Sequence, residues 1–251
     1  MRGISKLILA ATAPLFVGAA HAGEVKIAVA SNFLATMEQL ADDFEEETGH
    51  TARVSGGSTG KLFAQIQHGA PFDVFFAADV SRPEKLDEAG LIAEGSRFTY
   101  AVGQIALWSP EPGVAKDGEK ALKEQDFEHL AIANPKTAPY GLAAKHVLEH
   151  YGVWDDVVDR TVRGENIGQT FQFVKTGNAE IGFVALSQIH DPNKPVSGDY
   201  WLPSQDLYPK VEQQAVILES AADNDAASEF MDFVRSEKAA EVIESYGYAI
   251  P

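Results

Sequence analysis

Residues 55–60, Ser-Gly-Gly-Ser-Thr-Gly, are the part of the chain whose residue types point most directly to chemistry. They precede a stretch, 61–68, in which Leu62 and Ile66 are spaced as one face of a helix requires. Glycines allow a backbone to approach a ligand closely. A turn that leads into a helix has N–H groups without partners, and the helix dipole adds partial positive charge there. We therefore expect an anion-binding site at this turn.

Three other loops have the same small, polar character, and each follows a predicted strand. They are Ser31-Asn32, residues 134–141 and residues 164–169, and none has an Asp or Arg at its centre. Ligands of open α/β sheets bind at the carboxyl ends of strands, where such loops gather. We therefore expect the four loops to surround one site.

The segments between these loops alternate between strand-like and helix-like patterns. Residues 73–77 are typical of a strand covered on both faces of a parallel sheet. The predicted strands are residues 24–30, 51–55, 73–77, 100–108, 130–133, 161–163, 180–185 and 215–218. The predicted helices are residues 33–48, 61–68, 81–89, 142–151, 167–175 and two within 224–246. This alternation predicts an α/β protein with mostly parallel sheets.

The order of the segments predicts two lobes with a ligand cleft between them. Residues 100–108 resemble a crossing between two half-sheets, and residues 190–209, with four prolines, read as an irregular return connection. We assign residues 23–102 plus 196–251 to lobe 1 and residues 103–195 to lobe 2. A hinge at the two crossings would let the lobes close around a ligand.

Residues 1–22 have the pattern of a cleavable signal peptide. Arg2 and Lys6 give a basic start, residues 7–20 are apolar or small, and Ala20-His21-Ala22 fits a cleavage site. We expect cleavage after Ala22 and export. A retained anchor helix is the alternative, although the apolar run is short and Ala-rich for a membrane span.

Composition and charge exclude several classes of function. The chain has no Cys, which rules out disulfides, thiolate metal sites and Cys nucleophiles. Its net charge is −17, and it becomes −19 when Arg2 and Lys6 are removed, which leaves 18 basic and 37 acidic residues. This charge argues against binding to nucleic acid or anionic membranes. An anion must then be held by local dipoles, because distant charges are screened beyond about 10 Å, and we expect no electrostatic steering.

Two short patterns suggest enzymes. Gly60-Lys61 resembles the end of a nucleotide-binding P-loop, but Ser55 and Leu62 occupy positions that need Gly and Ser or Thr. The group His146/Glu149/His150 matches H-x-x-E-H, an inverted zinc-protease pattern, although no third ligand is evident nearby. A secreted zinc hydrolase therefore remains an alternative from another class.

Four stretches of the chain resemble a known family, the molybdate- and tungstate-binding proteins of periplasmic ABC uptake systems. The stretches are residues 28–33 (AVASNF), 56–79, 134–150 and 165–184. The resemblance implies the two-lobe (type II) periplasmic solute-binding fold and capture of molybdate, and of tungstate, for an ABC transporter permease. It implies no enzymatic activity and no cofactor, and we expect a monomer.

The resemblance also implies the residues that hold the oxyanion. In the family these are a Ser at the first strand end, a Ser in the second loop, and backbone N–H groups of the third and fourth loops. The matching positions here are Ser31, Ser58, Tyr140 and Ile167, and Asn32 sits where some members contribute a ligand group. These residues imply no direct metal-ion ligand. One departure is Ala185, where some members have a ligand-binding Tyr; either Asn32 replaces that donor or selectivity differs.

Some alternatives remain open from the residues themselves. Ser31 and Ser58 are also suited to be helix N-caps. A dianion without protons needs only donors, which disfavours phosphate, whose proton needs an acceptor. Sulfate, another tetrahedral oxyanion, differs from molybdate mainly in size and remains an alternative. A small carboxylate would want an Arg clamp, for which the candidates are Arg53, Arg97, Arg160 and Arg163.

Overall fold

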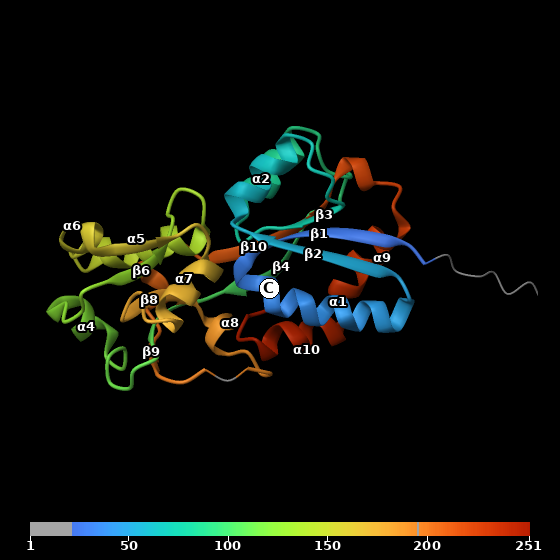
Figure 1. The fold of residues 1–251 in the computed structure, drawn as a ribbon. Coiled ribbons are helices and arrows are strands. Elements are labelled where there is room, and N and C mark those ends of the chain that lie inside the picture. Colours follow the sequence, from blue (N-terminus) through green and yellow to red (C-terminus); the bar gives the residue numbers. More distant parts are fainter. Residues whose placement is uncertain (1–21, 195) are drawn as a thin grey trace, which may run out of the picture.

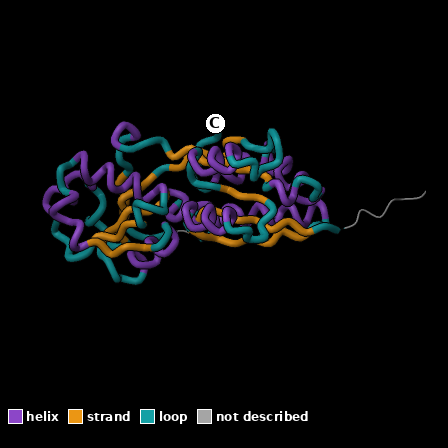
Figure 2. The backbone as a smooth tube through the Cα atoms, turned by 90° about the horizontal axis from the view of Figure 1, so that it is seen from above, coloured by secondary structure: helices purple, strands orange, loops and turns teal. Residues whose placement is uncertain are grey.

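The computed structural model describes residues 22–194 and 196–251, so the predicted signal peptide, up to residue 21, lies outside the described residues. The chain forms two five-stranded sheets, in the orders β2-β1-β3-β10-β4 and β7-β6-β8-β5-β9. Each sheet with its helices forms one lobe, and Figure 1 shows the two lobes side by side. Seen from above, the two lobes lie end to end and meet at the centre of the molecule (Figure 2).

The first lobe contains the beginning and the end of the chain. Its strands are β1 (Glu24–Ala30), β2 (Thr51–Gly57), β3 (Val74–Phe76), β4 (Phe98–Gly103) and β10 (Val211–Ile217). Its helices are the 3₁₀ turn η1 (Ser31–Phe33), α1 (Leu34–Thr48), α2 (Thr59–Gln67), α3 (Ser81–Glu88), α9 (Asp225–Val234) and α10 (Glu237–Ser245).

The second lobe is built from the middle of the chain. Its strands are β5 (Ile105–Ser109), β6 (Leu130–Ala133), β7 (Thr161–Gly164), β8 (Ile181–Ala185) and β9 (Asp199–Trp201). Its helices are α4 (Gly118–Glu124), α5 (Pro139–His150), α6 (Trp154–Val157), α7 (Ile167–Lys175) and α8 (Leu186–Ile189).

One strand in each sheet runs against the other four. In the first sheet β1 is parallel to β2 and β3, whereas β10 is antiparallel to β3 and β4. In the second sheet β6 is parallel to β7 and β8, whereas β5 is antiparallel to β8 and β9. The prediction of an α/β fold with mostly parallel strands is confirmed. The reversed strands, β5 and β10, are those that follow the two crossings between lobes.

The crossings differ in detail from the sequence-based expectation. The expected single strand 100–108 is wrong, because Gln104 separates β4 of the first sheet from β5 of the second. The expected irregular segment 190–209 contains β9, whose Trp201 pairs with Leu107 of β5. The chain therefore belongs with the second sheet up to Trp201, and does not return to the first lobe at residue 196. Helix α4 was not predicted; Asp117 caps it by accepting a hydrogen bond from the Lys120 N–H, at 3.1 Å.

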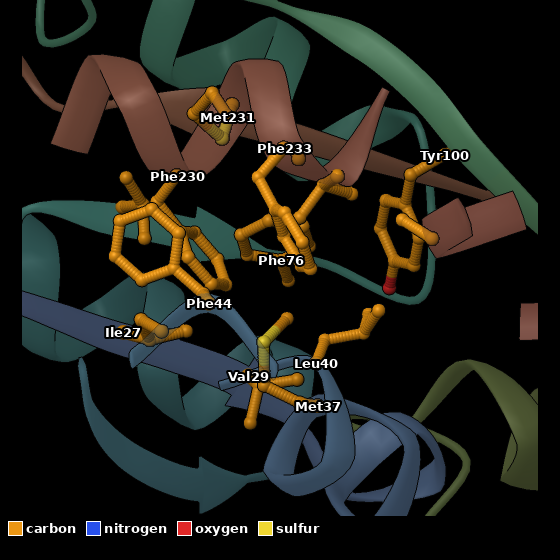
Figure 3. Packing of buried hydrophobic residues seen from close by; sticks show 14 of the residues in the cluster. Ile27, Val29, Met37, Leu40, Phe44, Phe76, Tyr100, Phe230, Met231 and Phe233 are labelled. Atoms are coloured by element: carbon orange, nitrogen blue, oxygen red, sulfur yellow. The ribbon is translucent and has the colours of Figure 1, made fainter. Parts of the chain in front are cut away.

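Both faces of each sheet are covered, which explains the continuous apolar strands. On β1, Ile27 and Val29 face a core formed with α1, α9 and α10, whereas Ala28 faces the opposite core under α2 and α3. Figure 3 shows the first core, where Phe44, Phe76 and Phe230 pack together. With both faces packed, the strand ends are the place where polar loops can form a site.

Candidate anion-binding site

A small cavity lies between the lobes, and all five predicted site residues line it. The lining residues are Ala30, Ser31, Asn32, Gly57, Ser58, Thr59, Ala78, Ala138, Pro139, Tyr140 and Ile167. Of these residues, all within the described part of the chain, none carries a charge at neutral pH.

Four helix starts meet at this cavity. The turn η1 begins at Ser31, α2 at Thr59, α5 at Pro139 and α7 at Ile167, and each comes after a strand of the parallel set. Parallel strands end at one edge of a sheet, so the helices that follow them begin at that edge. Their first N–H groups have no intrahelical acceptor and carry partial positive charge. The arrangement concentrates hydrogen-bond donors from both lobes without a formal charge.

Ser58 is a helix cap that also faces the cavity. Its Oγ accepts a hydrogen bond from the Lys61 N–H at 3.4 Å, and the residue is 3% exposed. A hydroxyl that accepts in this way still has its own proton to donate. Ser58 can therefore cap α2 and donate a hydrogen bond to a ligand at the same time.

Ser31 has a different role, because it joins the two lobes. The residue before it, Ala30, is the N-cap position of η1, and no side-chain cap is present there. The Ser31 Oγ instead accepts from the Gly168 N–H of α7, at 3.3 Å. The N-cap reading of Ser31 is therefore wrong, and its hydroxyl proton remains available to the cavity.

Tyr140 and Ile167 both line the cavity at the starts of helices. Tyr140 is the second residue of α5 and Ile167 the first residue of α7, positions whose N–H groups lack intrahelical acceptors. Both side chains are buried. Asn166 caps α7 by accepting from the Gln169 N–H at 2.9 Å. This cap leaves the N–H of Ile167 without a bond from Asn166.

The side-chain amide of Asn32 is not free to bind a ligand, contrary to the expectation from the sequence. Its Nδ2 donates to Gln213 Oε1 at 2.7 Å and to the Tyr248 hydroxyl at 3.0 Å. An amide nitrogen has two hydrogens, so both are used inside the protein. The expectation that this amide serves as a free donor is therefore corrected. The donor left at this position is the main-chain N–H of Asn32, within η1.

Ala185 is buried and supplies no donor side chain. It ends β8, and its N–H donates to Gln188 Oε1 at 3.0 Å. Gln188 Nε2 in turn donates to the Ile167 carbonyl oxygen at 3.2 Å. The position at which some family members have a Tyr therefore supports the start of α7 through Gln188.

The cleft is closed over the cavity by contacts that sequence reasoning missed. Gly60 N–H donates to the Thr137 carbonyl oxygen at 2.9 Å, and Lys61 forms an ion pair with Glu165. Lys61 is thus a cleft residue as well as a solvated helix residue. No local sequence signal identifies these contacts, because each partner lies in the other lobe.

The glycines of residues 55–60 lie in closely packed surroundings. A Cβ at Gly56 or Gly57 would meet Leu34 or Leu62 of the same lobe at 3.1 Å. A Cβ at Gly60 would lie 2.9 Å from the Thr137 oxygen of the other lobe. Gly56 and Gly57 thus lie against neighbouring side chains and Gly60 against the second lobe, while Gly57 also lines the cavity, so its close approach to a ligand stays a prediction.

The geometry supports neither a serine hydrolase nor a zinc hydrolase. Residues 56–60 also fit the G-x-S-x-G pattern of serine hydrolases, but no His, Asp or Glu is among the described residues lining the cavity, so Ser58 has no base there. Glu149 pairs with Lys145 at 3.1 Å. Within 22–194 and 196–251, the three-residue cluster with converging potential metal ligands is Glu128, His129 and Glu180, not the His146/Glu149/His150 group.

The four arginines named as possible carboxylate clamps lie outside the cavity lining. Arg53 bonds to Glu24, Arg97 to Asp87, Arg160 to the Phe127 carbonyl oxygen and Arg163 to Thr161. The cavity therefore lacks the guanidinium group that a carboxylate ligand would want.

Comparison with known proteins agrees with this geometry. Residues 25–249 match the family model of the bacterial extracellular solute-binding proteins. The chain is 49% identical to the molybdate-binding protein ModA of Azotobacter vinelandii over 247 residues, 98% of each chain. The chain belongs to the ModA family of solute-binding proteins. It is also 44% identical to ModA of Rhodobacter capsulatus, over 91% of this chain and 89% of that protein.

The solved structures extend this relationship to the fold. The periplasmic molybdate-binding protein of A. vinelandii superposes with a TM-score of 0.87 and 43% identity, covering 90% of this chain and 99% of that chain. ModA proteins are solute-binding proteins, so this chain is a binding protein and not an enzyme, and its family takes up a ligand without a cofactor. In the described part of the chain, no helix is both long and apolar enough to cross a membrane.

Proposed function

We propose that this protein captures molybdate, and tungstate, in the periplasm and delivers it to an ABC transporter permease. The observation that carries the proposal is the meeting of four helix starts from two lobes at one cavity without charged side chains. The two ModA relatives, both named as molybdate-binding proteins, support it.

The donors available at the cavity match a fully deprotonated tetrahedral dianion. They are the hydroxyls of Ser31 and Ser58 and main-chain N–H groups of Asn32, Ser58, Tyr140 and Ile167. Every oxygen of such an anion is an acceptor, so donors alone are required. Charge-assisted hydrogen bonds contribute about 1.5–3 kcal/mol each, so a set of this size can offset the cost of removing the anion from water. The lack of a carboxylate acceptor disfavours phosphate.

Ligand binding would close the cleft, because each lobe supplies part of the donor set. We place the hinge at Gln104, between β4 and β5, and at residues 202–210, between β9 and β10. This places the lobe boundaries at residue 104 and after Trp201, instead of at 102 and 195. The closed surface formed by both lobes is what the permease would recognise.

The signal peptide, with cleavage after Ala22, and the monomeric state belong to the same proposal. Export to the periplasm would place the mature protein, beginning at Gly23, where it meets the permease. A donor set drawn from two lobes of one chain requires no second copy.

A thermal-shift and calorimetric panel with molybdate, tungstate, sulfate, phosphate and chromate tests the proposal. Ligands that bind only the folded state raise the melting temperature. We expect large shifts with molybdate and tungstate and none with phosphate. A shift with sulfate equal to that with molybdate would make the protein a general oxyanion carrier, and no shift with any oxyanion would refute the function.

A further inference from the structure

A buried cluster of neutral polar side chains lies directly behind the anion cavity. We call it the Asn32 cluster; its members are Asn32, Tyr100, Tyr140, Ser187, Gln213 and Tyr248. Each is at most 5% exposed. They come from six separate parts of the fold: η1, β4, α5, α8, β10 and the C-terminal segment after α10. Such clusters fix one arrangement when their bonds are made, because unpaired buried polar groups are unfavourable.

The hydrogen bonds of this cluster hold both the side-chain amide and the main-chain carbonyl of Asn32. As described above, its amide donates to Gln213 and Tyr248. The main-chain carbonyl oxygen of Asn32 lies 2.9 Å from Ser187 Oγ and 2.8 Å from the Tyr248 hydroxyl, and both hydroxyls donate to it. The Ser187 and Tyr248 hydroxyls are themselves 2.9 Å apart. These two hydroxyls therefore hold the peptide group between Asn32 and Phe33, and through it the η1 turn that contains Ser31 and Asn32 of the cavity lining.

The two hydroxyls belong to different lobes. Ser187 lies in α8 of the second lobe, next to β8, whereas Asn32 and Tyr248 belong to the first lobe. Since Ser187 is carried by the second lobe, we infer that opening of the cleft moves it relative to Asn32 and Tyr248, although its neighbour Leu186 is bonded to the hinge residue Gln104 at 2.9 Å. The contact of the Tyr140 hydroxyl with Asn32 Nδ2, at 3.5 Å, would be lost in the same step. These bonds join the two lobes in the conformation described, in which the cleft is closed.

The C-terminal segment places Tyr248 at this junction. Ala249 pairs with Val102 of β4 through two backbone hydrogen bonds of 2.8 and 3.0 Å, close to the crossing at Gln104. Gly247 has a φ of +82°, and a Cβ there would lie 3.3 Å from Leu186 of α8. The segment is thus fixed to the hinge strand on one side and faces the second lobe on the other. Burial raises the pKa of the Tyr248 hydroxyl, so it remains a neutral donor.

We propose that Ser187 and Tyr248 are positioning residues that couple closure of the cleft to the Asn32 turn of the anion site. This inference rests on the proposed function. When the lobes close, Ser187 completes the bonds of the Asn32 carbonyl and so fixes the turn whose N–H groups face the anion. When the lobes open, the turn loses that restraint and the anion is released.

The test compares Ser187→Ala and Tyr248→Phe with two matched controls in the full mature chain. Tyr151→Phe removes a hydroxyl at the far end of α5, and Ser245→Ala removes an exposed hydroxyl that bonds only to Val242 within α10. Molybdate association and dissociation rates are measured by stopped-flow fluorescence. A smaller folded fraction would reduce the amplitude but not change the rates, so a destabilised variant remains informative.

We expect the dissociation rate to rise about tenfold in each cluster variant, as for loss of one hydrogen bond, with the association rate within about twofold of the wild type. The double variant should show less than the product of the two effects, because the hydroxyls share bonds. Wild-type dissociation rates in both variants, or equal changes in the controls, would overturn the coupling while leaving the function intact. Failure of the wild-type protein to bind molybdate would overturn both.

Discussion

The main-chain N–H of Gly60 donates a hydrogen bond to the carbonyl oxygen of Thr137, 2.9 Å away in the other lobe. This bond lies beside the cavity, since Gly60 follows Ser58 and Thr59, and Thr137 precedes Ala138, in the chain. A Cβ at residue 60 would stand 2.9 Å from the same oxygen and 3.1 Å from Arg82 Nη2. Closure of the cleft therefore depends on the absence of a side chain at this position.

The variant Gly60→Ala should bind molybdate more weakly without losing stability. The added methyl group holds the lobes apart, whereas alanine favours the first turn of α2 by about 0.5–1 kcal/mol over glycine. We expect at least a tenfold loss of affinity in calorimetry and an unchanged or higher melting temperature of the unliganded protein. Gln65→Ala, an exposed change on the same helix, is the control. Wild-type affinity in Gly60→Ala would show that full closure is not needed.

The variant Ser58→Asp should fold but not bind the oxyanion. Asp caps helices as well as Ser does, so α2 keeps its cap. Its carboxylate, however, would place a negative charge and an acceptor in a cavity that must supply donors. The matched control is Ser236→Asp, because Ser236 caps α10 by accepting from Ala239 N–H at 3.2 Å, outside the cavity lining. Molybdate titration heat should disappear only in Ser58→Asp; unchanged heat there would remove Ser58 from the site.

Stability should fall steeply above pH 10 because three cluster tyrosines are buried. Burial raises the pKa of Tyr100, Tyr140 and Tyr248 above the usual value of 10.0. In the unfolded chain they ionise near pH 10, and in the folded protein they stay neutral, so their contribution is complete below pH 10 and is lost as the pH rises. The slope is up to about 1.4 kcal/mol per pH unit for each tyrosine.

Urea unfolding between pH 8 and pH 11 measures how the free energy of unfolding changes with pH. The Tyr248→Phe variant removes one titrating group and should reduce this slope by up to about 1.4 kcal/mol per pH unit. Absorbance of phenolate follows the same groups in the folded state. Ionisation of all tyrosines near pH 10 with the protein still folded would contradict the buried cluster.

Molybdate affinity should not change between about pH 7 and pH 9. The cavity lining contains Ser, Thr, Asn and apolar residues and one Tyr whose pKa is raised, none of which changes its charge in this range. A site built on a charged His would lose affinity over the same range, because the imidazolium loses its proton there. Calorimetry in buffers of equal ionic strength is the measurement, and a titration with a midpoint inside this range would point to an ionisable ligand.

The site loops could be read from the sequence because each is local. A strand pattern, small polar residues and a helix pattern follow one another at Ser31, Ser58 and Ile167, and the physics of parallel sheets brings such loops to one edge. The break at Gln104 could not be read, because the residues on both sides have one continuous strand pattern and only pairing with different sheets separates them.

The Asn32 cluster also could not be predicted from the sequence, for a physical reason. Ser187 and Tyr248 meet the Asn32 carbonyl from 155 and 216 residues away, and nothing in their neighbouring residues marks them. The orientation of the Asn32 side chain depends on those partners. A sequence can therefore indicate that Asn32 lies at the site without showing that its amide is used elsewhere.

A crystal structure of the mature protein with molybdate, in which anomalous scattering locates the molybdenum, tests the central claim most directly. We predict one molybdate in the cavity between the lobes, bonded to the hydroxyls of Ser31 and Ser58 and to the N–H groups of Tyr140 and Ile167, with no Lys or Arg in contact. Molybdenum outside this cavity, or an anion held by charged side chains, would contradict it.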